Sequence, residues 1–363
     1  MSTLEYKPGL SVEDLPADLQ KKEPLKLASN ENPLGPSPLA LQAIRDNLAT
    51  LHIYPAKQIE LQLRQAIATY LGQQLGPEHI VIGSGGIEVL EFVARSYLTT
   101  PDAESVLPRQ TFPFLARYHG RSGQKIRFYD LDEDDFSYYP DRIAAAITPQ
   151  TRLVYVCNPN NPTGTYVPAN VLRQIMEVVP NDVLLIHDEA YYDFVDAPDY
   201  PDAVPEVLAG KNIFIMRTFA KIYGLAGLRL GFGIASPLII DRVASVKRNF
   251  HVNKLALIAG LAALKDDAHR QRTLANNVAG KQWLTGQLSH LGCRVWPSQA
   301  NFVLFSHKTV PAQTLIDGLM AQAIIVRPAF GLDNHIRLTI GTPEENARLV
   351  ESLTAVLQKE IGD

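Results

Sequence analysis

The segment TFAKIYGLAGLRLGF, residues 218–232, places two reactive groups in one short apolar stretch. Lys221 lies among small and apolar residues, and Arg229 follows it between two leucines. A lysine in an apolar setting has a lowered pKa and can act as an amine nucleophile. An arginine nearby offers a fixed cation for a phosphate or a carboxylate. A loop lysine and a salt-bridged arginine would give the same pattern, so the stretch alone leaves both interpretations open.

Strand and helix patterns alternate on both sides of this segment. Short apolar runs predict strands at 79–83, 105–107, 125–129, 153–157, 183–187, 212–217 and 230–234. Helical patterns lie between several of them. This alternation predicts a mostly parallel α/β sheet with helices on both faces. Ligands of such sheets bind beyond the carboxyl ends of the strands.

Polar residues gather at those predicted strand ends. Asp188 follows the apolar run LLIH, NPNNPTG (158–164) follows another strand, and Phe112 follows a third. The glycines of residues 84–86 precede a predicted helix, where backbone amides can face an anion. Taken singly, the acid could be a helix N-cap and the glycines a tight turn. The prediction of a site therefore depends on these loops converging at one edge of the sheet.

The rest of the chain predicts a second, smaller unit. Helical patterns at 238–248, 254–264 and 267–290 precede strands at 294–296, 302–305, 324–327 and 336–340, with helices at 312–322 and 343–357. Residues 1–35 look irregular, and LASNENPLGPSP (27–38) predicts an ordered loop that could line a pocket rim. We expect an N-terminal arm and part of the small domain at 1–45, a large domain at 46–255 and a small C-terminal domain at 256–363.

Composition narrows the function classes. The chain has 363 residues, of which 46% are apolar and 20% charged, as in ordinary globular proteins. A net charge of -4 gives no general attraction to nucleic acid or to membrane surfaces. No apolar run reaches the length of a membrane span, and the N-terminus does not look like a signal peptide. Cys157, Cys293 and the histidines show no metal-binding spacing, so we expect a cytoplasmic protein without a metal site.

The motifs together resemble the fold type I family of pyridoxal 5'-phosphate (PLP)-dependent aminotransferases, in its class II branch. Within that family the chain is most similar to the histidinol-phosphate aminotransferases. The resemblance extends over nearly the whole chain, through YKPG, LASNENPLGPSP, Tyr54-Pro55, CNPNNPTG, DEAYYDF, TFAKIYGLAGLRLGF, FHVNKLA and IRLTIGTPEEN. It implies a PLP cofactor, a large domain with a mostly parallel sheet and a smaller α/β C-terminal domain.

The resemblance also implies roles for single residues. Lys221 would bind PLP covalently and later move the proton between the substrate Cα and the cofactor. Asp188 would bind the pyridine nitrogen and keep it protonated. The phenolic oxygen of the ring would accept hydrogen bonds from Tyr191 and Asn161, and Phe112 would stack on the ring face.

Binding of the phosphate and of the substrate is implied in the same way. The cofactor phosphate would be held by Gly85, Gly86, Ile87, Thr218 and Arg229, and by Tyr54 of the neighbouring subunit. Asn32 and Arg337 would lie at the substrate, with Arg337 binding its carboxylate, and Arg327 would bind the substrate's phosphate. Ala220 and Gly86-Ile87 depart from the family, which usually has serine and Ser-Asp there, so the phosphate site would depend more on backbone amides and Arg229.

The implied activity is amino transfer between histidinol phosphate and 2-oxoglutarate in histidine biosynthesis, by a homodimer with shared active sites. Related alternatives are an aromatic amino-acid aminotransferase and a threonine-phosphate decarboxylase. Two further classes remain open. A nicotinamide- or flavin-dependent oxidoreductase is disfavoured because GSGG lacks the third glycine of the dinucleotide motif. The other class is a protein with the same PLP-binding fold that has a binding or regulatory role and no catalytic activity.

Overall fold

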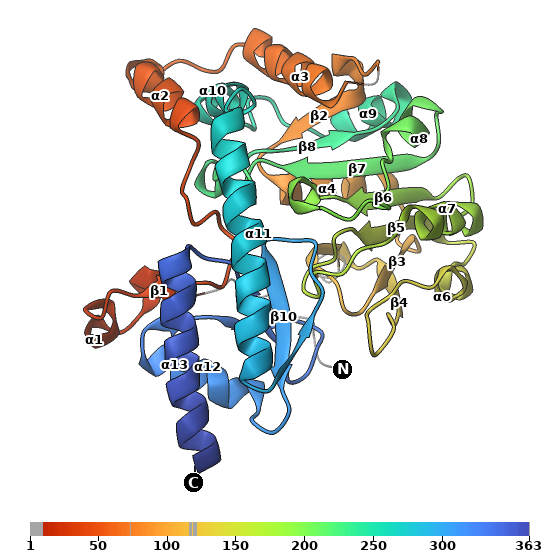
Figure 1. The fold of residues 1–363 in the computed structure, drawn as a ribbon. Helices are drawn as coiled ribbons and strands as arrows, with labels where there is room; N and C mark the ends of the chain where they lie inside the picture. Colours follow the sequence, from red (N-terminus) through yellow and green to blue (C-terminus); the bar gives the residue numbers. More distant parts are fainter. Residues whose placement is uncertain (1–9, 73, 116–117, 119–121, 363) are drawn as a thin grey trace.

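The computed structural model describes residues 10–362 except 73, 116–117 and 119–121 (Figure 1). Its larger sheet has seven strands in the order β2-β8-β7-β6-β5-β3-β4. The strands are β2 (Ile80–Gly83), β8 (Gly231–Ile234), β7 (Ile213–Thr218), β6 (Leu184–Asp188), β5 (Thr151–Cys157), β3 (Glu104–Pro108) and β4 (Lys125–Tyr129). All run parallel except β8, which is antiparallel to both of its neighbours. The mostly parallel α/β sheet expected from the sequence is confirmed.

Helices cover both faces of this sheet because its strands are apolar on both sides. One face packs against α4 (Gly86–Tyr97) and α9 (Pro237–Ala244), with Leu90 and Val93 buried beside Tyr155 and Ile186. The other face packs against α3 (Lys57–Leu71), α6 (Pro140–Ala146), α7 (Ala169–Val178), α8 (Val204–Leu208) and α10 (Lys254–Ala263). The helix α2 (Pro38–Asn47) begins at a capping serine and packs on α10.

A second sheet of four antiparallel strands has the order β12-β13-β10-β9. Its strands are β9 (Cys293–Trp296), β10 (Phe302–His307), β12 (Arg327–Pro328) and β13 (Ile336–Thr339). Three helices share its core, namely α11 (Asp267–His290), α12 (Ala312–Ala321) and α13 (Pro343–Gly362). In Figure 1, α11 extends from α10 beside the large sheet down along the small one, so a single helix links the two sheets.

The N-terminal segment differs from its irregular appearance in the sequence. It contains α1 (Ala17–Gln20) and the strand β1 (Leu25–Lys26), which pairs in parallel with β11 (Ile324–Ile325) near the end of the chain. Such a short strand has no local signal, because its pairing partner is distant in sequence. Among the other predicted elements, two differ clearly from their predicted bounds. The helix predicted at 238–248 ends at Ala244, and the strand predicted at 324–327 is divided into β11 and β12.

Within the described ranges no helix combines the length and the apolar character needed to cross a membrane. Among the same residues, no group of three or more histidine, cysteine, aspartate and glutamate side chains is arranged to hold a metal ion.

Candidate active site

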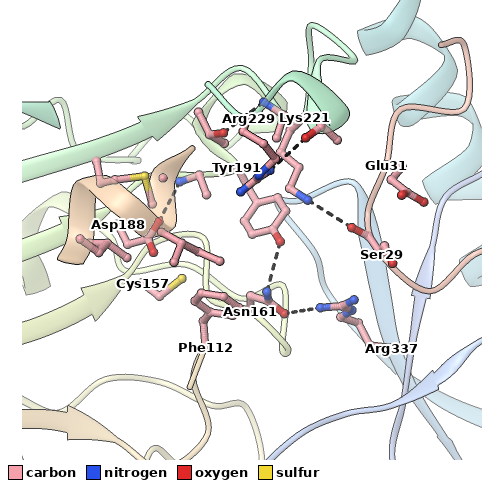
Figure 2. Close-up of a pocket in the computed structure, with 18 of the residues that line it drawn as sticks. Ser29, Glu31, Phe112, Cys157, Asn161, Asp188, Tyr191, Lys221, Arg229 and Arg337 are labelled. Atoms are coloured by element: carbon pink, nitrogen blue, oxygen red, sulfur yellow. Dashed lines mark hydrogen bonds between the residues drawn. The ribbon is translucent and has the colours of Figure 1, made fainter. Parts of the chain in front are cut away.

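A cavity of about 390 Å³ lies where the carboxyl ends of β5, β6 and β7 meet the N-terminus of α4, the arm before α2 and the small sheet. Most of the residues singled out from the sequence line it, although they come from segments far apart in the chain. They are Gly86, Ile87, Phe112, Asn161, Asp188, Tyr191, Thr218, Lys221, Arg229, Arg327 and Arg337. Figure 2 shows several of them around one space.

Lys221 lies in the loop that leaves β7. The loop is held by the Thr218 hydroxyl, which accepts a hydrogen bond from the Ala220 amide at 3.1 Å and donates one to the Leu230 carbonyl at 3.2 Å. The Lys221 amine donates to the carbonyls of Ser29 and Asn30, at 3.2 and 3.1 Å. These neutral acceptors leave the amine without a bonded counter-ion. Burial, assisted by the positive charge of Arg337, therefore lowers the pKa of Lys221 to about 7.

Asp188 ends β6, and only 2% of it is exposed. Its Oδ2 accepts a 2.6 Å hydrogen bond from the Tyr155 hydroxyl, and its Oδ1 accepts one from the Ala190 amide at 3.1 Å. Burial raises the pKa of Asp188 to about 6, and these two donors oppose that rise. The carboxyl group is therefore mainly ionised at neutral pH. An anion at the wall of a cavity is suited to bind a cationic ring nitrogen.

Tyr191 and Asn161 form the next part of the wall. The Tyr191 hydroxyl accepts hydrogen bonds from the side-chain amides of Asn30 at 3.0 Å and Asn161 at 3.2 Å. The Asn161 oxygen accepts a 2.8 Å bond from Arg337, whose guanidinium also donates to the Ala28 carbonyl. Burial raises the pKa of Tyr191, so its phenol stays protonated at neutral pH and can donate to a ligand. This chain of contacts connects β6, the 158–164 loop, the arm and the small sheet.

The N-terminus of α4 provides an anion site. Its capping residue, Gly85, has φ +88°, and a Cβ there would lie 2.5 Å from a terminal nitrogen of Arg229. A Cβ on Gly86 would lie 2.6 Å from the sulfur of Met216. Both glycines therefore let the backbone approach the cavity closely. The first amides of a helix have no partner within the helix, and together with Arg229 and Thr218 they suit a phosphate group.

These groups match the chemical requirements of PLP. The cofactor needs an amine for its carbonyl carbon, an acid for its ring nitrogen, donors for its phenolic oxygen and a cradle for its phosphate. Lys221, Asp188, the pair Tyr191 and Asn161, and the start of α4 offer these in turn around one cavity.

Three of the residues singled out from the sequence are not part of the cavity wall. Gly85 lies directly behind the wall, next to Arg229. Tyr54 is 75% exposed and stacks on Phe250, with ring centroids 4.7 Å apart. Asn32 donates to the Ile222 carbonyl at 2.9 Å and to the Thr273 hydroxyl at 3.1 Å, so its amide fastens the Lys221 loop to α11.

Several residues of the site were missed in the sequence. The cavity wall also includes Ser29, Glu31, Cys157 and Met216, and Tyr155 lies behind Asp188. Cys157 and Tyr155 are alternate residues of β5 and share a face, but only the pairing with β6, which sets Cys157 opposite Asp188, places them at the site. Ser29 and Glu31 carry no comparable local signal beyond the polar density of the arm.

Comparisons with known proteins support the same interpretation. The chain matches the family model "Aminotransferase class I and II" over residues 22–353. It is 40% identical to a histidinol-phosphate aminotransferase of Moorella thermoacetica and 38% identical to histidinol-phosphate aminotransferase 1 of Nitrosococcus oceani. Each alignment covers 98% of this chain, with 92% and 94% of the relatives. The solved histidinol-phosphate aminotransferase of Sinorhizobium meliloti, in complex with PLP, matches with a TM-score of 0.87 at 25% identity, covering 99% of this chain and 98% of that one.

Proposed function

The chain belongs to the class I and II aminotransferase family, and on this premise we propose that it transfers an amino group between histidinol phosphate and 2-oxoglutarate in histidine biosynthesis. The observation that carries the proposal is the pairing of a low-pKa amine with a buried carboxylate across one cavity. The choice of substrate is supported by the relatives that match over nearly their whole length.

PLP, when bound, supplies a protonated pyridine ring that withdraws electrons from the substrate Cα. Lys221 would hold the cofactor through Nζ, and its lowered pKa keeps a large neutral fraction of the amine available at pH 7. When not bonded to the cofactor, the same nitrogen would be placed to move the proton between the substrate Cα and the cofactor.

The remaining wall residues orient the cofactor. Asp188 would bind the ring nitrogen, and Tyr191 and Asn161, which are bonded to each other, would donate to the phenolic oxygen of the ring. Phe112 would cover one ring face. The start of α4, Thr218 and Arg229 would hold the phosphate and so help to keep the reacting carbon near Lys221.

Two arginines are proposed to bind the substrates. Arg337 is 3% exposed and reaches the cavity from β13, so its guanidinium can bind a carboxylate in a dry setting. Arg327 lies at the cavity wall on β12 and is proposed to bind the phosphate of histidinol phosphate. Asn32, which bonds the Ile222 carbonyl just after Lys221, is proposed to act at the substrate by keeping the arm in place.

We propose a cytoplasmic homodimer with shared sites. Exposed apolar side chains gather around the loop after α2, namely Leu48, Leu51, Ile53, Tyr54 and Phe250. Apolar patches of this kind mark interfaces. A second copy covering them would bring its Tyr54 to the phosphate of this chain's cofactor. Cys157 and Cys293 are both free and buried, which suits a reducing compartment.

Steady-state assays with matched amino donors test the activity. With PLP and 2-oxoglutarate present, kcat/KM for histidinol phosphate should exceed that for phenylalanine or tyrosine by at least tenfold, because only the first offers a phosphate to Arg327. Replacement of Arg327 by methionine should remove most of that preference and leave phenylalanine turnover nearly unchanged. Faster turnover of the aromatic amino acids, or release of CO₂ from threonine phosphate, would instead support one of the two related activities.

A further inference from the structure

We propose that Tyr155 is a positioning residue that holds the Asp188 carboxylate ionised and aimed at the cofactor. The inference deepens the proposed function, because it depends on the role given there to Asp188. Tyr155 does not line the cavity, and nothing in the sequence motifs distinguishes it from the apolar residues of β5.

The strand register places the phenol behind the acid. β5 and β6 run parallel, with Tyr155 opposite Ile186 and Cys157 opposite Asp188. Alternate residues of a strand share a face, so Tyr155 and Asp188 lie on the same face of the sheet. Tyr155 precedes the position opposite Asp188 by two residues. The phenol reaches across this offset, and its hydroxyl donates to Asp188 Oδ2 at 2.6 Å.

Burial keeps water away from this hydrogen bond. Tyr155 is 1% exposed and packs in the apolar layer under α4 and α9. Burial also raises the pKa of Tyr155 well above its usual range, so the phenol remains a donor at every pH at which the protein is studied. A buried hydroxyl with an ionised acceptor 2.6 Å away forms a charge-assisted hydrogen bond, which is stronger than a bond between neutral groups.

The carboxylate receives one protein donor on each oxygen. The Ala190 amide bonds Oδ1 and the Tyr155 hydroxyl bonds Oδ2, and each oxygen keeps a lone pair for the cavity. Without the hydroxyl, Oδ2 would be buried with only the cavity side left to satisfy it. Desolvation would then favour the protonated acid, which cannot hold a proton on the ring nitrogen.

The other ionisable groups around Asp188 do not replace this donor. His187 and Glu189 alternate to the opposite face, where Glu189 pairs with Arg217 at 2.7 Å and with His187 at 2.9 Å. Lys221 acts on Asp188 from the cavity side, and the buried Cys157 thiol and Tyr191 phenol are neutral. Tyr155 is therefore the side-chain donor that the fold supplies to Asp188 from behind.

Replacement of Tyr155 by phenylalanine tests the coupling in the cofactor-free protein. Asp188 has a folded pKa raised above its unfolded value, so ionising it lowers stability as pH rises through that pKa. In Y155F the pKa of Asp188 in the folded protein should be higher still, so stability should keep falling up to a higher pH. The unfolding equilibrium constants of the two proteins, measured in urea at pH 5 and pH 8, should diverge by roughly tenfold or more at the higher pH.

A matched control separates this effect from simple loss of a hydroxyl. Tyr138 is also buried, and its hydroxyl donates to the Cys157 carbonyl at 3.2 Å and to the Asn160 side chain at 3.3 Å, both neutral acceptors. Y138F should lose stability by the same factor at both pH values. If Y155F behaves in the same way, Tyr155 has only a structural role and the proposal is wrong.

A second measurement tests whether the contact between Tyr155 and Asp188 affects cofactor binding. PLP should bind Y155F roughly ten- to a hundredfold more weakly, because Asp188 is more often protonated in the free variant and has to be ionised to pair with the ring nitrogen. In a D188N background, where no carboxylate can ionise, Y155F should show neither the pH-dependent divergence nor this loss. If D188N binds PLP as tightly as the parent protein, Asp188 does not have the role proposed for it at the ring nitrogen. The urea result would then still decide whether Tyr155 and Asp188 are coupled.

Discussion

At the scale of single residues, the site contains two groups, Lys221 and Asp188, whose charged forms are destabilised by burial in the free protein. Lys221 has only carbonyl partners, and Asp188 is buried with neutral donors on both oxygens. Burial moves the pKa of the amine down to about 7 and that of the acid up to about 6. A cofactor that binds the amine covalently and brings a cationic nitrogen to the acid would relieve both costs, so part of its affinity would come from the cost of burying these two charges in the free protein.

The pH dependence of the cofactor-free protein should show the cost at Lys221. Its folded pKa lies below its unfolded value, so the unfolded chain binds more protons between pH 7 and about 10.5, and stability rises with pH over that window. A K221M variant has no charge to bury. It should be the more stable protein at pH 7, with an advantage that shrinks as pH approaches 10.

Urea unfolding of the cofactor-free proteins at pH 7 and pH 9.5 measures this difference. Lys247, which pairs with Glu60 at 2.7 Å, gives the control, because K247M should lose a favourable contact and not gain stability at pH 7. An advantage of K221M that is unchanged or larger at pH 9.5 would mean that the amine is not destabilised by burial.

At the scale of elements, the start of α4 combines a glycine conformation with an anion site. Gly85 has φ +88° and lies against Arg229, so a side chain there both strains the backbone and displaces the guanidinium. Figure 2 shows Arg229 at the rim of the same space as Lys221. The proposed phosphate cradle would therefore be formed by contact between two segments and not by the helix alone.

The variant G85A should lose PLP affinity by at least tenfold, with a loss of stability of about 1–3 kcal/mol. Gly210 provides the matched control, since its φ is +74° and nothing lies within 4 Å of its would-be Cβ. G210A should lose a similar amount of stability and keep its PLP affinity. Equilibrium titration with PLP and thermal unfolding measure both quantities. Equal PLP affinity in the two variants would contradict the cradle.

The same scale explains what the sequence could and could not predict. The strands of the large sheet and the loops after them were predictable, because apolar runs and turn residues are local signals. β1 was not, since two residues become a strand only by pairing with β11 across almost the whole chain. Tyr155 and Glu31 were missed for the same reason. Their importance comes from neighbours in space, and no motif reports it.

At the scale of the molecule, the cavity belongs to neither sheet alone. Lys221 and Asp188 come from the large sheet, Arg327 and Arg337 from the small one, and Ser29 and Glu31 from the arm. The boundaries predicted at 45/46 and 255/256 stay predictions. The single helix α11 links both sheets, so any change in their relative position would alter the distance between the arginines and Lys221 (Figure 1).

A hybrid dimer tests whether Tyr54 acts in the neighbouring site. K221A and Y54A should each be weakly active, for loss of the amine and of a phosphate contact. If Tyr54 comes from the partner, a dimer with one chain of each kind holds one complete site. Random mixing should then restore about a quarter of the parent activity. Activity equal to the sum of the separate variants would show that Tyr54 serves its own chain or none.

The most direct test of the central claim is the visible absorption of the PLP-loaded protein during a half-reaction. Histidinol phosphate is added without any oxo acid, so a transaminase can only move the amino group to the cofactor. We predict that the band of bound PLP disappears and that 2-oxoglutarate restores it, while K221A shows neither change. A band that histidinol phosphate leaves unmoved, in protein that carries PLP on Lys221, would contradict the account.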